Sequence, residues 1–180
     1  FGATVGRYIG RIIGPKITID GTTYNLQENG KGVVSHGGKP GFADRVWDVV
    51  NVGPQSLTLR YVSPDGENGY TGELTTTLTY ILRDDGALSI DFIATTNKPT
   101  VVNLANHSFF NISGNPERSV ETQSLWVDSK EIAEYDKNKN VTGNFLNVKH
   151  TPFDFRKPRQ IGERIDDDNE QLKITGGYDH

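Results

Sequence analysis

Short runs of alternating apolar and polar residues recur along this chain, with turn residues between them. The runs cover residues 16–24, 45–52, 56–62, 74–82, 87–95, 101–104 and 124–127. A period of two places one side of a strand against a core, and strands that recur about every 10 to 15 residues are typical of a sandwich or barrel. No repeat, low-complexity tract or linker interrupts the pattern. It predicts one all-β domain over residues 1–180.

Local turn signals sharpen this expectation. Asp20-Gly21 divides residues 16–24 into a hairpin, and Asp85-Gly86 closes another turn. Residues 2–14 are rich in glycine and carry Arg7 and Arg11, and the glycine-rich residues 29–42 are expected to form a loop. Only residues 129–136 are predicted to be helical, as one short helix.

Composition excludes several classes of protein. The 180 residues carry a net charge of −4 without a basic run, which argues against binding to nucleic acid or to an anionic membrane surface. No apolar stretch approaches the length of a transmembrane helix. The chain contains no cysteine, so disulfides and thiolate metal sites are excluded. The first residues contain neither an initiator methionine nor a signal peptide, which predicts an internal or processed segment.

The richest polar stretch surrounds His107 and reads NLANHSFFN over residues 103–111. It follows a strand-like run, so His107 is expected at or near a strand end. An imidazole flanked by amides, a hydroxyl and two aromatic rings can transfer a proton near neutral pH. Taken alone, the stretch also fits a histidine that neighbouring amides satisfy inside a sheet.

Other polar side chains are predicted on loops of the β scaffold, namely Arg11, His36 and Asp179. Together with nearby aromatic residues they have the composition of a carbohydrate site. Each also has an ordinary structural explanation: a surface salt bridge for Arg11, a turn for His36 and a turn carboxylate for Asp179. No histidine is spaced from another as metal ligands usually are, so no metal site is predicted.

Six segments in order resemble the aldose 1-epimerase (galactose mutarotase) family. They are residues 1–8 (FGATVGRY) with Arg11, 35–38 (SHGG), 63–70 (SPDGENGY), 102–111 (VNLANHSFFN), 151–156 (TPFDFR) and 177–180 (GYDH). One segment alone is a weak signal, whereas six in the family's order are specific.

The resemblance implies a large antiparallel β-sandwich, incomplete at both ends, that interconverts the α and β anomers of a free aldohexose such as glucose or galactose. It implies that His107 is the general acid on the ring oxygen. It also implies that Arg11, His36 and Asp179 bind the sugar, and that no cofactor is needed. The resemblance favours the cytoplasm, with secretion as the alternative, and the sequence leaves the compartment open.

Two departures from the family pattern matter. The family's glutamate base lies beyond the position matched by Asp179, so the chain is expected to lack it and to need a companion chain or a continuation. Gly10 stands where many members carry asparagine, which leaves the preferred hexose open. The alternatives are a non-catalytic sugar-binding β-sandwich and a structural sandwich domain of a larger carbohydrate-processing enzyme.

Overall fold

The computed structural model describes residues 2–179 and consists mainly of β-strands joined by turns. The chain divides into two compact units, Phe1–Phe109 and Phe110–His180, referred to below as the N-terminal and C-terminal units. Strands predominate, as the alternation predicts. Within residues 2–179, no helix has both the length and the apolar character required to cross a membrane.

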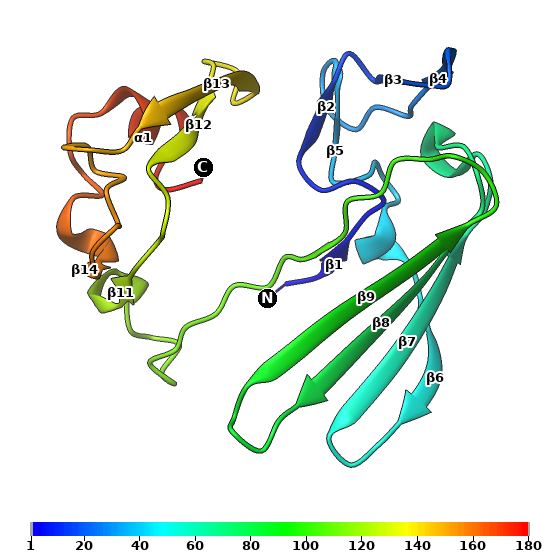
Figure 1. The fold of residues 1–180 in the computed structure, drawn as a ribbon, viewed down its shortest axis with the longest axis horizontal. Coiled ribbons are helices and arrows are strands. Elements are labelled where there is room, and N and C mark those ends of the chain that lie inside the picture. Colours follow the sequence, from blue (N-terminus) through cyan, green and yellow to red (C-terminus); the bar gives the residue numbers. More distant parts are fainter. Residues whose placement is uncertain (1, 180) are drawn as a thin grey trace. The chain divides into compact units, whose positions relative to one another are not determined.

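A four-stranded antiparallel sheet in the order β6-β7-β8-β9 forms the frame of the N-terminal unit (Figure 1). Its strands are β6 (Asp48–Val52), β7 (Ser56–Ser63), β8 (Leu74–Leu82) and β9 (Leu88–Thr96). Leu78 on β8 pairs with Leu59 and Phe92 on the neighbouring strands. The next residue, Thr79, pairs with Thr58. Successive residues therefore point to opposite faces of the sheet, as the period-two pattern requires. Leu59, Leu78 and Phe92 share one face, while Thr58 and Thr79 share the other with the exposed side chains of Val62, Ile81 and Ile93.

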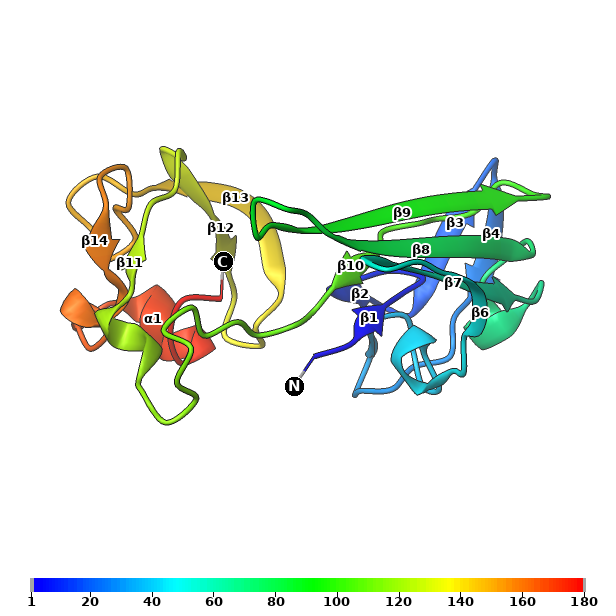
Figure 2. The same cartoon turned by 90° about the horizontal axis from the view of Figure 1, so that it is seen from below.

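Three short strand pairs complete this unit. They are β1 (Thr4–Val5) with β10 (Ala105–Asn106), β2 (Arg11–Ile13) with β5 (Val33–Ser35), and β3 (Lys16–Ile19) with β4 (Thr22–Asn25). The last pair is the predicted hairpin, and Asp20 and Gly21 have φ values of 49° and 77°, as a type I′ turn requires. Figure 2 shows β1 and β10 side by side. This pair joins the beginning of the unit to its end.

The connections contain two 3₁₀ turns, η1 (Phe42–Asp44) and η2 (Glu67–Gly69). Val34 on β5, Tyr70 directly after η2 and Leu26 directly after β4 form a buried cluster, with Ile12 of β2 packed against it. On β8, Leu74 and Leu78 are also buried. Apolar burial therefore fixes β2 and β5 as well as the sheet.

The C-terminal unit has shorter elements. They are β11 (Ser124–Leu125) paired with β14 (Arg159–Gln160), β12 (Glu131–Tyr135) paired with β13 (Val141–Asn147), the 3₁₀ turns η3 (Val120–Thr122) and η4 (Ile161–Glu163), and α1 (Glu170–Thr175). A small core of Val148, Phe153 and Leu172 lies among them. The side chain of Gln171 bonds both the N–H and the C=O of Tyr135, at 2.8 and 3.1 Å, and so fastens α1 to β12.

The prediction of a helix over residues 129–136 is wrong. That segment forms β12, because pairing with β13 satisfies its backbone groups and outweighs its helix-forming composition. The α-helix is α1, which has Asn169 as its N-cap and a left-handed Gly176 at its C-terminus. The strand predicted at residues 101–104 is also displaced. Asn103 forms only an isolated bridge, and β10 begins at Ala105.

Candidate active site

One segment, residues 3–11, connects the predicted site residues of the N-terminal unit. It contains Arg11 and includes β1, which pairs with β10. His107 follows β10 directly, which confirms its expected place at a strand end. The backbone N–H of His107 donates to the C=O of Ala3 at 2.8 Å. The β1–β10 pair and this hydrogen bond therefore fix the backbone position from which the His107 side chain extends.

The other end of the same segment holds His36. Arg11 pairs with Ser35 across β2 and β5, and the N–H of His36 donates to the C=O of Gly10 at 2.9 Å. In return, the N–H of Gly10 donates to Nδ1 of His36 at 3.3 Å. Because Nδ1 accepts a hydrogen bond, the neutral ring carries its proton on Nε2.

The two imidazoles lie against each other. The ring centroids of His36 and His107 are 5.3 Å apart and the rings are nearly perpendicular, at 87°. On another side of His107 lies the ring of Phe109, at 5.2 Å between centroids, and Phe109 is 76% exposed. Both imidazoles are half-buried. Two imidazole rings that can carry protons therefore lie next to the exposed ring of Phe109.

Arg11 is exposed and neighbours His36 through the β2–β5 pair. The structure therefore brings Arg11, His36 and His107 into one part of the N-terminal unit. Asp179 lies in the C-terminal unit, where it is exposed and follows α1. Its convergence with the histidines stays a prediction.

The amide next to His107 has a different task from the one expected. The side-chain oxygen of Asn106 accepts from the N–H of Ser108 at 3.0 Å, and its NH₂ group donates to the hydroxyl of Tyr80 at 3.3 Å. Asn106 thus shapes the chain around His107 and ties it to β8. Within residues 2–179 the imidazole of His107 contacts rings, and no hydrogen bond from Asn106 orients it.

Arg7 was not predicted from the sequence, yet it is the most deeply buried charged group of the segment, at 2% exposure. Burial lowers the pKa of its guanidinium, while the nearby carboxylates of Glu67 and Asp65 oppose that shift. Burial also raises the pKa of Tyr61 to about 12, helped by its hydrogen bond to Glu67. The only sequence signal for Arg7 was its place in a matched family segment.

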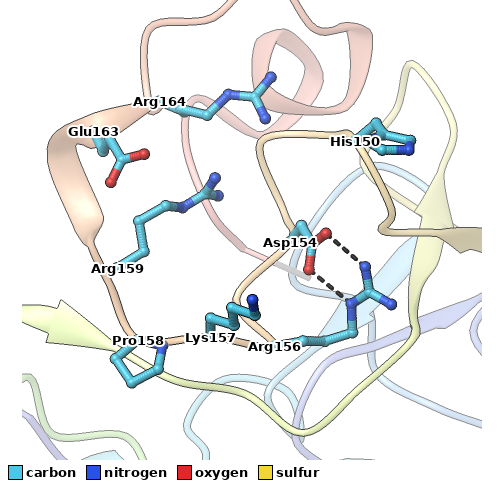
Figure 3. Close-up of a pocket in the computed structure, with 8 residues that line it drawn as sticks. All are labelled: His150, Asp154, Arg156, Lys157, Pro158, Arg159, Glu163 and Arg164. Atoms are coloured by element: carbon cyan, nitrogen blue, oxygen red, sulfur yellow. Dashed lines mark hydrogen bonds and ion pairs between the residues drawn. The ribbon is translucent and has the colours of Figure 1, made fainter.

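The C-terminal unit contains a cavity of about 710 Å³ with a cationic lining, comprising Arg156, Lys157, Arg159 and Arg164 (Figure 3). Arg156 forms a double hydrogen bond with Asp154, at 2.7 and 2.6 Å. This bond holds the pKa of the Asp154 carboxyl well below its usual range. Arg164 pairs with Asp167 at 2.6 Å. Partners within the unit therefore already compensate much of this positive charge.

No three histidine, cysteine, aspartate or glutamate side chains gather as a metal site in the described part of the chain. The predicted site residues of the N-terminal unit, His36, His107 and Arg11, supply two imidazoles and a guanidinium. Such groups can exchange protons and donate hydrogen bonds to hydroxyls.

Comparison with known proteins bears on what this site does. The aldose 1-epimerase family model matches residues 1–180. Aldose 1-epimerase of Escherichia coli (strain K12) is 35% identical over 179 residues, which make up 99% of this chain and 51% of the relative. Galactose mutarotase of Sus scrofa is 36% identical over 180 residues, or 100% of this chain and 51% of the relative. The chain therefore spans about half the length of the curated relatives it matches.

Solved structures agree with these relatives. Galactose 1-epimerase from Lactobacillus acidophilus NCFM superposes with a TM-score of 0.86 at 28% identity, covering 97% of this chain and 52% of that one. An aldose epimerase homologue from C. elegans superposes with a TM-score of 0.81 at 30% identity, covering 96% and 49%. The predicted all-β sandwich class is thereby confirmed. Since the family model matches every residue from 1 to 180, this chain belongs to the aldose 1-epimerase family.

Proposed function

We propose that this protein interconverts the α and β anomers of free aldohexoses, glucose and galactose among them, by acid–base opening and reclosure of the sugar ring. The observation that carries the proposal is the pair of imidazoles of His36 and His107, whose ring centroids are 5.3 Å apart. Arg11 pairs with Ser35, the residue before His36. Family membership supports an enzyme over a non-catalytic sugar-binding sandwich or a structural domain. Residues 1–180 are taken as part of one sandwich domain.

In the proposed mechanism His107 donates a proton to the ring oxygen while a base removes the proton of the anomeric hydroxyl. The C1–O5 bond then breaks and leaves an open-chain aldehyde. Rotation about C1–C2 and reclosure with the proton transfers reversed give the other anomer. Each positioned acid or base contributes roughly 10²–10⁴-fold to the rate, and the proton transfers need no cofactor.

Arg11, His36 and Asp179 are proposed to bind the sugar hydroxyls. The bond from the N–H of Gly10 to Nδ1 of His36 fixes the orientation of the imidazole that the proposal assigns to a sugar hydroxyl. The family resemblance implies a glutamate as the base, and none of the six matched segments supplies it. No comparison supports a separate companion chain, so the proposal does not include one.

The test is a His107→Asn variant of the complete protein, assayed by polarimetry, with His150→Asn as its control. His150 is an exposed histidine that lines the cationic cavity of the C-terminal unit. Loss of the proton donor should lower the turnover number by at least ~10²-fold, while His150→Asn should keep the parent rate. Near-parent turnover of a folded His107→Asn variant would remove His107 from the mechanism.

A further inference from the structure

Arg7 uses its whole guanidinium to bond the end of the four-stranded sheet. Its Nε donates to Oγ of Ser63 at 2.9 Å, and its Nη2 donates to the C=O groups of Ser63 and Pro64, both at 2.9 Å. Nη1 donates to the C=O of Thr71 at 3.1 Å. Ser63 ends β7, and Thr71 comes shortly before β8 begins. The side chain therefore fastens residues 3–11 to the turn between β7 and β8.

None of these hydrogen-bond acceptors is a carboxylate, so Arg7 is a buried cation held by neutral groups. Its nearest compensating charge is Glu67, which is reached through the hydroxyl of Ser63. Glu67 also accepts from the hydroxyl of Tyr61 at 2.7 Å and pairs with Arg45 at 2.7 Å. Apolar side chains often fill such a space at a lower free-energy cost than buried charges. Filling this space with a charged network therefore costs more free energy than apolar side chains would. That cost suggests that the network is kept because it fixes the geometry of the surrounding backbone.

The backbone of Arg7 touches the supports of both imidazoles. The C=O of Arg7 accepts from the N–H of Asn103 at 2.8 Å, on the segment that leads through β10 to His107. On the other side lies Gly37, directly after His36. A Cβ atom at Gly37 would be 1.9 Å from the C=O oxygen of Gly6 and 2.5 Å from the backbone N of Arg7. The Gly6–Arg7 peptide therefore lies between the two histidine-bearing segments.

We propose that Arg7 is a positioning residue: by fastening the Gly6–Arg7 peptide to the β7–β8 turn, it sets the spacing and relative angle of the His36 and His107 rings. The geometric part of the proposal stands on the contacts of the N-terminal unit alone. Its consequence for catalysis rests on the proposed mutarotase function. A buried arginine that only stabilised the fold would affect the free energy of unfolding and leave the ring geometry of folded molecules unchanged.

The test compares ring geometry in Arg7→Lys with that in Leu57→Ala. Lysine keeps the charge but cannot reproduce the fork of donors to Ser63, Pro64 and Thr71. Leu57 is half-buried on β7 at the end of the strand remote from Ser63, so its truncation weakens the same unit elsewhere. The 180-residue chain is labelled with ¹³C-histidine, and the ring signals are assigned with His36→Asn and His107→Asn.

In the parent chain we expect a nuclear Overhauser effect between the His36 and His107 rings. Arg7→Lys should abolish it and shift both ring signals, while the His150 signal stays in place. Leu57→Ala should retain the effect. If folded Arg7→Lys keeps the parent effect and shifts, the positioning role is wrong; the same conclusion follows if Leu57→Ala loses the effect equally.

A milder variant covers the case in which Arg7→Lys does not fold. Ser63→Ala removes only the bond from Nε of Arg7 and the link to Glu67, and should shift both ring signals in a folded chain. Unshifted signals in that variant would contradict the proposal.

Mutarotation kinetics then separate the two hypotheses. Misplaced rings should lower kcat about 10- to 100-fold in Arg7→Lys, with a smaller change in KM. Parent-like kcat in a variant with displaced rings would contradict the catalytic consequence. These kinetics use the complete protein, because the six matched segments do not supply the glutamate base. Absence of mutarotation there would overturn the proposed function, and the NMR comparison would still decide the role of Arg7 in ring geometry.

Discussion

The two units of the chain hold their charged side chains in different ways. In the N-terminal unit Arg7 is 2% exposed and bonds backbone carbonyls at the end of a long antiparallel sheet. In the C-terminal unit the pairs Arg156–Asp154 and Arg164–Asp167 are partly exposed to water, with side chains 24% to 36% accessible. A buried cation that loses its partners keeps the full desolvation penalty, whereas a solvated pair is screened. We therefore expect the stability of the N-terminal unit to depend far more on Arg7 than that of the C-terminal unit depends on any one of these exposed arginines.

Each unit contains one tryptophan, which allows the comparison to be measured within a single chain. Trp47 packs against Phe42 and Tyr61 in the N-terminal unit. Trp126 is 57% exposed in the C-terminal unit. Fluorescence of Trp126→Phe and Trp47→Phe backgrounds therefore reports the urea unfolding of each unit separately.

The largest effect is expected from Arg7→Met. Methionine fills much of the same space, but it removes every donor that Arg7 supplies to Ser63, Pro64 and Thr71, and it removes the charge opposite Glu67. Of these acceptors, the C=O of Pro64 still receives the N–H of Glu67 at 3.1 Å. We expect the free energy of unfolding reported by Trp47 to fall by about 3–5 kcal/mol.

The matched change in the C-terminal unit is Arg156→Met. It breaks the double hydrogen bond to Asp154, whose carboxylate stays accessible to water. We therefore expect a much smaller fall in the Trp126-reported free energy of unfolding. Equal losses in the two units would erase the contrast between buried and solvated arginines.

A smaller difference in the free energy of unfolding is expected between alanine substitutions at two glycines with a left-handed backbone conformation. Gly37 and Gly176 have φ values of 87° and 81°, and alanine at either position incurs strain of about 1–2 kcal/mol. A Cβ atom at Gly176 would meet nothing within 4 Å, whereas at Gly37 it would collide with the Gly6–Arg7 backbone.

Gly37→Ala should therefore cost clearly more than Gly176→Ala in urea unfolding. It should also displace the His36 ring signal. Similar costs for the two variants would show that residues 36–38 yield easily, and would weaken the idea of a rigid support for His36.

The smallest expected effects concern the pH dependence of stability, which Tyr61 affects at alkaline pH and Asp154 at acid pH. The pKa of Tyr61 rises from 10.0 to about 12 on folding, because burial and the bond to Glu67 favour the protonated phenol. Tyr61 makes its full contribution to the free energy of unfolding below pH 10, and this contribution is lost as pH rises from 10 towards 12. Tyr61→Phe should flatten that alkaline decline in the Trp47 signal.

In the C-terminal unit the arginine-bonded carboxylate of Asp154 has a lowered pKa. Its contribution is therefore present above the ordinary value of 3.8 and is lost as pH falls below it. Asp154→Asn should flatten the acid decline in the Trp126 signal, and only slightly because the pair is solvated. An unchanged slope in both variants would show that these two groups do not control the pH dependence of stability.

The parts of the fold that follow from neighbouring residues could be predicted. Residues 74–82 form β8 with the expected ends, and the hairpin turns at Asp20-Gly21, because alternation and turn chemistry act over a few residues. Residues 129–136 were misassigned because their state depends on β13, which propensity cannot register. The strands β2 and β5 were missed for a similar reason, since their glycine-rich surroundings favour loops until the two strands pair.

The features of the candidate site also fall into those set by neighbouring residues and those set by contacts between distant segments. From the amino-acid sequence one can predict that His107 follows a strand, propose Arg11 and His36 as further site candidates, and see the resemblance to aldose 1-epimerases. The 5.3 Å between the ring centroids of His36 and His107, and the burial of Arg7 between the segments that carry them, become visible only in the folded chain. The physical reason is that these contacts join segments far apart in the chain. Their geometry is set by strand pairing and by hydrogen bonds shielded from water, neither of which any local stretch of sequence contains.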